Sequence, residues 1–192
     1  MSFKDVHVGS YCFLDFETTG VDTTCQTNVT PIQIGCVYAS PDLTNLLEYQ
    51  RLIKWDKFMK YDKWPDKWVR AYRVHNIPLE KVKDEGIWPY QVMEELIEIG
   101  KEVQECLGTK KSCAIISDAP NFEMFFMQMI FGNKADPEWP FYKNAWSVYP
   151  LFQIFKVDPL YDRKPHDALE DARILYKGMI ECYDKTRGIT TI

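Results

Sequence analysis

Two carboxylates, Asp15 and Glu17, lie two residues apart in a segment that is otherwise apolar, with Phe13, Leu14 and Phe16 around them. Such a segment is typical of a central β-strand, in which side chains two residues apart point to the same face. Two like charges side by side inside a fold are costly unless a partner neutralises them. The pattern therefore indicates a site for Mg²⁺ or Mn²⁺, which prefer carboxylate oxygens. The alternative is a strand whose carboxylate face is simply solvated.

A second group of polar residues stands at the start of a predicted helix. Asp167 and Glu170 have the spacing of a capping box, which places the helix start near Ala168. His166 would then lie on the loop before the helix, and Asp171 in its first or second turn. A histidine ahead of the cap can fold back toward the site that the helix carboxylate faces. The alternative is a surface carboxylate favoured by the helix dipole and an ordinary loop histidine.

A third group follows residues 112–117, a short apolar segment with the character of a buried strand. Asp118 comes at the end of this segment, where α/β proteins tend to bind ligands. Pro120 suits the first turn of a helix, and Glu123 would lie one turn further on. Capping of the helix by Asp118 and a dipole-favoured position for Glu123 are the alternative explanations.

In chain order, these groups resemble the motifs of the DEDDh branch of the DEDD exonuclease superfamily. FLDFETTG at 13–20 resembles the first motif, and IQIG at 32–35 resembles the strand that follows it. VHNI at 74–77 stands where the family often has a His-Gly-Ile turn. Residues 117–123 resemble the second motif, and HDALEDA at 166–172 resembles the third motif in its histidine form.

The resemblance extends from about residue 11 to residue 180. It implies an α/β fold, with a mixed sheet of ribonuclease H type flanked by helices, and a single exonuclease domain over residues 1–192. The implied reaction is hydrolysis of the terminal phosphodiester at a 3′ end, which releases nucleoside monophosphates. The implied cofactors are two Mg²⁺ or Mn²⁺ ions, and the implied partner is the 3′ end of single-stranded DNA or RNA.

The resemblance also assigns roles to the residues of the first and third motifs. Asp15 would bridge both metal ions, while Glu17 and Asp171 would hold the ion that carries the attacking water. His166 would be the general base, because histidine exchanges protons near neutrality.

The second motif departs from the family pattern. The family has His-Asn followed four or five residues later by an aspartate ligand, whereas this sequence has Ser117 and Asp118, with Glu123 in the five-residue register. Register favours Glu123 as the metal ligand, and the short side chain of Asp118 at a strand end keeps it as a second candidate. The departure also supports an alternative function, a nucleic-acid-binding or interaction module of the same fold that has lost catalysis. A metal site unrelated to nucleases is a third hypothesis.

The family further implies where the substrate would lie. Backbone around residues 16–19 would face the terminal nucleotide, which makes Thr18 and Thr19 candidate binding residues. Phe16 or a neighbouring apolar side chain would stack on the base.

The elements that must position these residues can be predicted from hydrophobic patterning. Strands are expected at 11–17, 31–38, 46–55 and 112–117, with the third antiparallel to the second and a turn near residues 40–42. Helices are expected at 65–74, 89–107, 120–131 and 168–184. Residues 145–155 fit a strand or a helix equally well. Helices covering a sheet in this order predict an α/β domain.

The charge is unevenly distributed along the chain. The net charge of −5 argues against bulk-charge binding of long duplex DNA. Segment 51–75 carries eight basic and three acidic side chains, a net charge of +5, which leaves −10 for the rest. The segment also carries six aromatic residues: Trp55, Phe58, Tyr61, Trp64, Trp68 and Tyr72. Basic side chains interleaved with aromatic rings suit a single strand. The alternative is a solvated surface whose aromatics belong to the core.

The remaining sequence features bear on the protein's surroundings. The six cysteines show no CxxC spacing, which predicts reduced, mostly buried thiols. There is no run of 18 apolar residues, so no membrane span is expected. The first ten residues lack the apolar core of a signal peptide, which predicts a cytoplasmic rather than a secreted protein. Because many members of the resembled family are dimers, a homodimer is a further expectation.

Overall fold

A mixed sheet of five strands forms the centre of the protein in the computed structural model, which describes residues 8–20, 29–132, 138–142, 144–158 and 166–189. The strands are β1 (Ser10–Thr18), β2 (Pro31–Ala39), β3 (Asn45–Leu52), β4 (Cys113–Ser117) and β5 (Trp146–Ser147). Their order across the sheet is β3-β2-β1-β4-β5. β2 runs antiparallel to β1 and β3, whereas β4 runs parallel to β1 and β5. β1, which is buried along its whole length, therefore lies at the centre.

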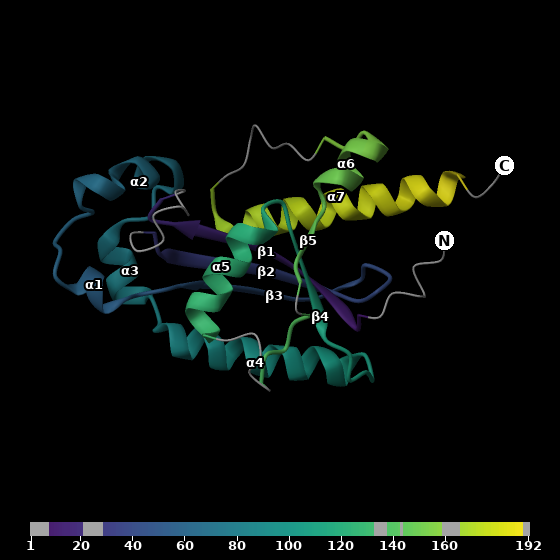
Figure 1. Ribbon diagram of the computed structural model, residues 1–192, viewed down its shortest axis with the longest axis horizontal. Coiled ribbons are helices and arrows are strands. Elements are labelled where there is room, and N and C mark those ends of the chain that lie inside the picture. The colour runs from purple at the N-terminus through teal and green to yellow at the C-terminus, as the bar shows by residue number, and fades with distance from the viewer. Residues whose placement is uncertain (1–7, 21–28, 133–137, 143, 159–165, 190–192) are drawn as a thin grey trace.

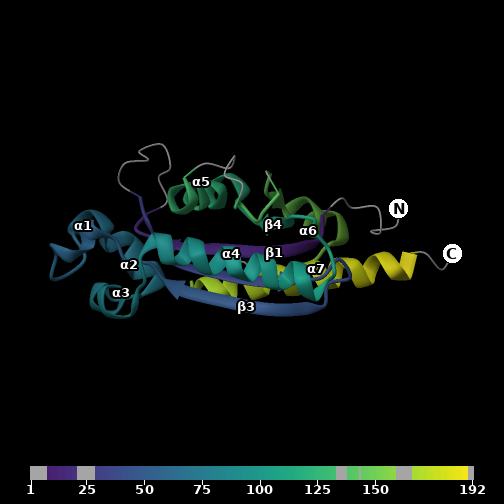
Figure 2. The same ribbon diagram turned by 90° about the horizontal axis from the view of Figure 1, so that it is seen from below.

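Helices cover both faces of the sheet and one of its ends. They are α1 (Asp56–Met59), the 3₁₀ helix η2 (Asp66–Trp68), α2 (Val69–His75), α3 (Leu79–Glu85), α4 (Pro89–Cys106), α5 (Pro120–Phe131), α6 (Tyr149–Phe155) and α7 (Ala168–Ile189). Figure 1 shows the sheet between α7 and α4, with α1, α2 and α3 gathered beyond one end. Figure 2 shows α4 in front of the sheet, with β3 running along one of its edges.

Alternation along β1 divides the apolar core into two layers. Leu14 and Phe16 point toward α4 and α5 and pack in one buried cluster. Phe13 points to the other face, where it packs with α6 and α7. A third cluster, built around Phe58 and Trp68, holds α1, α2 and α3 together. Asp15 and Glu17 share the parity of Phe13 and so lie on the α7 side of the strand.

Most of the predicted elements are present, with differences at short elements and ends. The strands at 11–17, 31–38 and 112–117 are confirmed, and the third strand ends at Leu52 rather than residue 55. The helix expected at 65–74 is split into η2 and α2, and α1 and α3 were not predicted. Residues 145–155 contain both a two-residue strand and a helix. The last helix continues to Ile189, beyond the predicted end at 184.

The cysteines that the structure describes are free thiols, and most of them are buried. Four of the described cysteines are buried thiols: Cys12, Cys36, Cys113 and Cys182. Cys106 is a free thiol at the surface, and Cys25 lies outside the described residues. None of the described helices combines the length and apolar composition needed to cross a bilayer.

Gly35 on β2 allows the start of α7 to approach the sheet. It pairs with Asp15 across the strands, and a Cβ at this position would collide with the backbone of Ala168 and Leu169. We expect Gly35→Ala to lower the free energy of unfolding by about 2–3 kcal/mol, because overpacking against backbone cannot be relieved by a rotamer change. Urea denaturation measures this loss.

A matched substitution controls for the change of glycine to alanine itself. A Cβ at Gly20 would meet nothing closer than the Val29 Cγ2 atom at 3.7 Å. Gly20→Ala should therefore leave the denaturation midpoint nearly unchanged. Equal midpoints for the Gly35→Ala variant and the wild type would show that α7 does not depend on this close approach.

Candidate active site

Asp15 and Glu17 occupy the C-terminal half of β1 and are almost completely buried, with exposed fractions of 6% and 7%. They point to one face of the sheet, as their spacing predicts. Phe16 between them points to the opposite face, where its ring lies 5.7 Å from the ring of Phe126. The expectation that Phe16 stacks on a base is therefore corrected, because this ring belongs to the core beneath the carboxylates.

The N-terminus of α7 places His166 and Asp171 beside Glu17. The side chain of Asp167 caps the helix by accepting a hydrogen bond from the Glu170 backbone N–H at 3.2 Å. His166, just ahead of the cap, has a left-handed backbone with a φ of 53°. One ligand atom each from Glu17, His166 and Asp171 lies within 4.8 Å of the others. The predicted return of His166 toward the helix carboxylate is thus confirmed.

Two glutamines hold the start of α7 against the sheet. Gln33 donates to the Asp167 carboxylate at 3.0 Å and accepts from the Ala168 backbone N–H at 3.1 Å. Gln50 donates to the same carboxylate at 2.7 Å and 2.8 Å. These bonds fix Asp167 and Ala168, which lie between His166 and Asp171 in the chain. The sequence analysis missed them, although an amide within the apolar 31–38 strand is a usable signal.

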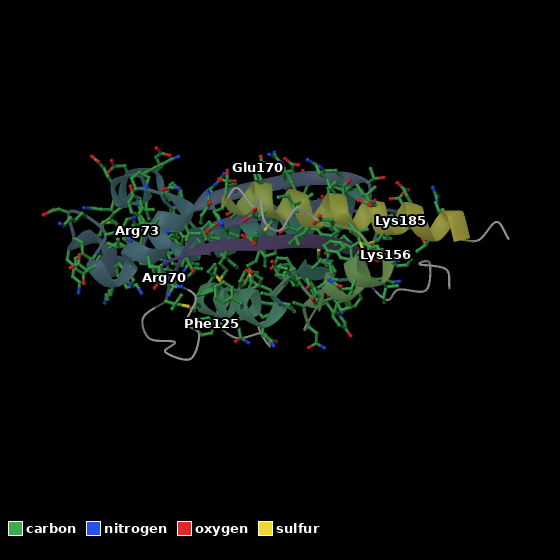
Figure 3. The ribbon with its side chains drawn as sticks, turned by 90° about the horizontal axis from the view of Figure 1, so that it is seen from above. Arg70, Arg73, Phe125, Lys156, Glu170 and Lys185 are labelled. Atoms are coloured by element: carbon green, nitrogen blue, oxygen red, sulfur yellow. The ribbon has the colours of Figure 1, made fainter. Side chains whose placement is uncertain are left out.

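Asp118 and Glu123 complete a second cluster with Asp15. Asp118 follows the C-terminal end of β4, and Glu123 lies in the first turn of α5 with an exposed fraction of 2%. One carboxylate oxygen from each of the three residues lies within 4.8 Å of the others. Both candidates for the second-motif ligand are therefore present at the site. Figure 3 shows α5 and α7 on opposite sides of β1.

The donor sets of the two clusters suit divalent metal ions. The Glu17–His166–Asp171 cluster offers two carboxylates and an imidazole, and the Asp15–Asp118–Glu123 cluster offers three carboxylates. Carboxylate oxygens are the ligands that Mg²⁺ and Mn²⁺ prefer. The imidazole can either bind a transition-metal ion or stay outside the ligand shell of the metal and act as a base. Since Asp15 and Glu17 are neighbours on one strand face, the two sets adjoin each other. The residues present therefore fit a pair of hard cations.

Comparison with solved structures identifies the architecture. The nuclease domain of 3′hExo, a DEDDh family member bound to rAMP, superposes with a TM-score of 0.69 at 18% identity, covering 94% of each chain. The structure of a 3′-exonuclease that recognises the 3′ end of the histone mRNA stem-loop superposes with a TM-score of 0.68 at 18% identity, covering 94% of this chain and 84% of the other. E. coli Exonuclease I with a dT13 oligonucleotide gives 0.62 at 12% identity, covering 90% of this chain and 40% of the other.

The chain has the fold of the DEDDh exonucleases. The mixed sheet flanked by helices is the ribonuclease H-like arrangement expected from the sequence motifs. No family model matches the sequence, and no curated protein matches it either. The motifs at 13–20, 117–123 and 166–172 thus meet within a DEDDh exonuclease fold although overall identity is low.

The Thr18 and Thr19 hydroxyls bind the backbone where β1 ends. Thr18 Oγ1 donates to the Gly20 carbonyl at 2.5 Å, and Thr19 Oγ1 accepts from the Thr30 backbone N–H at 3.0 Å. The Thr19 backbone N–H donates to the Thr30 carbonyl at 2.9 Å. These contacts fix the backbone at the end of β1, next to Glu17.

The aromatic residues of segment 51–75 form the core of the α1–α3 region. Phe58, Trp64 and Trp68 are buried together, and Tyr61 and Tyr72 pack against them. The Trp64 indole N–H donates to the Ile77 carbonyl at 2.8 Å, inside the core. Stacking of bases on the three buried rings, as the segment's composition suggested, is therefore wrong. Lysine side chains lie over some of these rings at the surface, including Lys57 and Lys67 over Trp68.

His75 ends α2, where it is buried and interacts electrostatically with His166 of the Glu17–His166–Asp171 cluster. Its Nδ1 accepts a hydrogen bond from the Ile77 backbone N–H at 2.9 Å. Burial lowers the pKa of His75 to about 4, and the charge of His166 acts in the same direction. Asn76 follows with a φ of 55°, a left-handed conformation that asparagine tolerates, at the position where the family often has glycine.

The lowered pKa of His75 predicts an acid-sensitive contribution to stability. The unfolded chain binds a proton at His75 below about pH 6.5, whereas the folded chain does so only below about pH 4. The free energy of unfolding should therefore fall as pH drops from about 6.5 to about 4, by about 2–3 kcal/mol from this residue. His75→Asn keeps an acceptor for the Ile77 N–H but cannot titrate. The difference between its pH–stability curve and that of the wild type isolates the effect, and parallel curves would contradict it.

Proposed function

We propose that the protein is a metal-dependent 3′–5′ exonuclease that hydrolyses the terminal phosphodiester of single-stranded DNA or RNA and releases nucleoside monophosphates. The observation that carries the proposal is the meeting of two adjoining ligand clusters at Asp15 and Glu17. The similarity to 3′-exonucleases described with rAMP or an oligonucleotide supports it.

The ligand sets suggest a division of work among the carboxylates. Asp15 and the second-motif residues would hold one cation, while Glu17 and Asp171 would hold the other, with Asp15 between the two. When bound, two divalent cations stabilise charge on the attacking and leaving oxygens of a phosphodiester. The burial of these carboxylates restricts water and strengthens their electrostatic interactions.

His166 would remove the proton from the attacking water. Its imidazole lies with Glu17 and Asp171, in the cluster that does not include Glu123. The Asp167 cap and the glutamine contacts restrict the backbone that carries it. A base held in this way can accept the proton as the water attacks the phosphorus.

Arginines on α2 provide a path for the phosphates of the strand. Arg70 and Arg73 are exposed on this helix, whose last residue, His75, interacts electrostatically with His166. Figure 3 places Arg70 on the same side of the molecule as Phe125 of α5. The basic side chains of segment 51–75 would thus contact the phosphates of a nucleic-acid strand whose 3′ end lies at the carboxylates.

The two candidates for the second-motif ligand can be separated by isosteric amides. We expect Glu123→Gln to lower kcat/KM by about 10²-fold or more, because it removes a buried ligand charge. Asp118→Asn should cost about 10-fold, since Asp118 is only half-buried and suited to a water-mediated role. Steady-state cleavage at saturating Mg²⁺ compares them. Full activity of Glu123→Gln would reverse the assignment.

The activity itself is tested with matched DNA and RNA oligonucleotides labelled at either end. With Mg²⁺ or Mn²⁺, a 3′ label should be released at once as a mononucleotide, whereas a 5′-labelled strand should shorten stepwise. Chelation by EDTA should stop both. If neither strand loses nucleotides while the protein still shifts it in a gel, the protein is a binding module of the same fold.

A further inference from the structure

A groove of about 500 Å³ lies along α5, the helix that carries Glu123. Pro120 and Asn121 line its near end, within the turn that joins Asp118 to Glu123. Its far end reaches Gln128, five residues and about 7.5 Å along the helix from Glu123. The groove therefore begins within one helical turn of Glu123, on the same helix.

The lining of the groove suits a nucleobase better than a phosphate. None of its described lining residues is ionisable, and three of them are amides: Asn121, Gln128 and Asn144. Each amide offers both donors and an acceptor, the combination found on base edges. Phe125 supplies a half-buried ring in the same lining. The volume lies within the range of about 300–1,000 Å³ typical of ligand sites.

Aromatic side chains continue this surface beyond Asn144. Tyr142 and Trp146 flank it in sequence, and their rings lie 6.3 Å apart, with exposed fractions of 41% and 37%. Exposed rings of this size next to a groove are typical of surfaces that stack on bases. In contrast, the aromatic rings of the α1–α3 region lie in or against its core.

We propose that the α5 groove binds one of the two nucleobases of the substrate strand that adjoin the scissile phosphate. The base stacks on Phe125 and hydrogen-bonds to the amides of Gln128 and Asn144. The backbone phosphates of the strand face the arginines of α2. This inference rests on the proposed function, because the carboxylate clusters define where the scissile phosphate lies.

Two variants test the groove without touching the carboxylates. Phe125→Ala removes the ring, and Gln128→Glu places a negative charge in the groove. Gln153→Glu makes the same charge change on an exposed position of α6 and serves as the matched control. Thermal unfolding and circular dichroism confirm that each variant is folded.

Binding of a fluorescein-labelled ten-nucleotide strand, measured by anisotropy in Ca²⁺, is the first readout. We expect Phe125→Ala and Gln128→Glu to weaken binding by about 10-fold relative to Gln153→Glu, within the range of one stacked base. Unchanged binding by both variants would overturn the inference. If the wild type binds but never cleaves, and the variants weaken that binding, the groove is supported while the exonuclease proposal fails.

Hydrolysis of the 4-nitrophenyl ester of thymidine 5′-monophosphate is the second readout, because this ester carries a single nucleoside. Hydrolysis that is unchanged in both variants, together with weakened binding of the long strand, assigns the groove to the base on the 5′ side of the scissile phosphate. Reduced hydrolysis of the ester as well assigns it to the terminal base. Both results support a base site, and they place it on opposite sides of the reacting phosphate.

Discussion

Replacing Asp15 with asparagine is expected to reduce nucleotide release by about 10³-fold or more while leaving the fold intact, because metal stabilisation of the transition state is worth several kcal/mol. The change removes one negative charge and keeps the size of the side chain. Asp15 belongs to the cluster with Asp118 and Glu123 and is the neighbour of Glu17 on the same strand face. The two ligand clusters therefore adjoin each other at Asp15 and Glu17.

In the absence of metal, the same substitution should raise the stability of the fold, although it lowers the activity. Three carboxylates with oxygens within 4.8 Å of one another repel each other unless protons or cations neutralise them. In EDTA the Asp15→Asn variant should therefore unfold at a higher temperature than the wild type. Added Mg²⁺ should raise the Tm of the wild type much more than that of the variant, since ligands that bind only the folded state stabilise it.

A substitution of an exposed carboxylate serves as the control for the change of charge. Asp84→Asn on α3 removes the same charge at a distance from the clusters, so its activity and its Mg²⁺-dependent Tm shift should match those of the wild type. If Asp15→Asn keeps full activity, the proposed catalytic role of the β1 carboxylates is refuted. An unchanged Mg²⁺-dependent Tm shift in that variant would show that the metal binds elsewhere.

The elements that position the site could be predicted where local and tertiary preferences agree. β1, β2 and β4 are predominantly apolar segments, and α4 and α7 have apolar stripes at helical spacing, so the local pattern alone indicates them. α1 and α3 have four and seven residues, too few for an isolated helix to be stable. These short helices form because Phe58 and Val82 pack with Trp68, a set of contacts that no local pattern specifies.

In the site too, the residues that belong to sequence motifs were predictable, whereas the residues brought in by long-range contacts were not. The convergence of Asp15, Glu17, His166 and Asp171 was predictable because each belongs to a recognisable sequence motif. The bond from Gln33 to Asp167 spans 134 positions of the sequence and has no motif of its own. The aromatic residues of segment 51–75 were ambiguous for a related reason, since a ring that stacks on a base and a ring that fills a core look alike in a sequence.

The general base is tested most directly at His166. We expect His166→Ala to slow cleavage by about 10²–10⁴-fold, the usual contribution of a general base. The Mg²⁺-dependent rise in Tm should be largely retained, which distinguishes this variant from Asp15→Asn. The limb of the pH–rate profile that reports loss of a proton from the base should be present in the wild type and absent in the variant.

The backbone of His166 calls for a second variant. Its φ of 53° is a conformation that asparagine tolerates better than alanine, so alanine could reduce activity through strain at the start of α7. His166→Asn keeps the backbone preference and removes the base, and it should lose as much activity as His166→Ala. If His166→Asn instead cleaves at nearly the wild-type rate, the residue acts by shaping the turn before α7, and another group takes the proton from the attacking water.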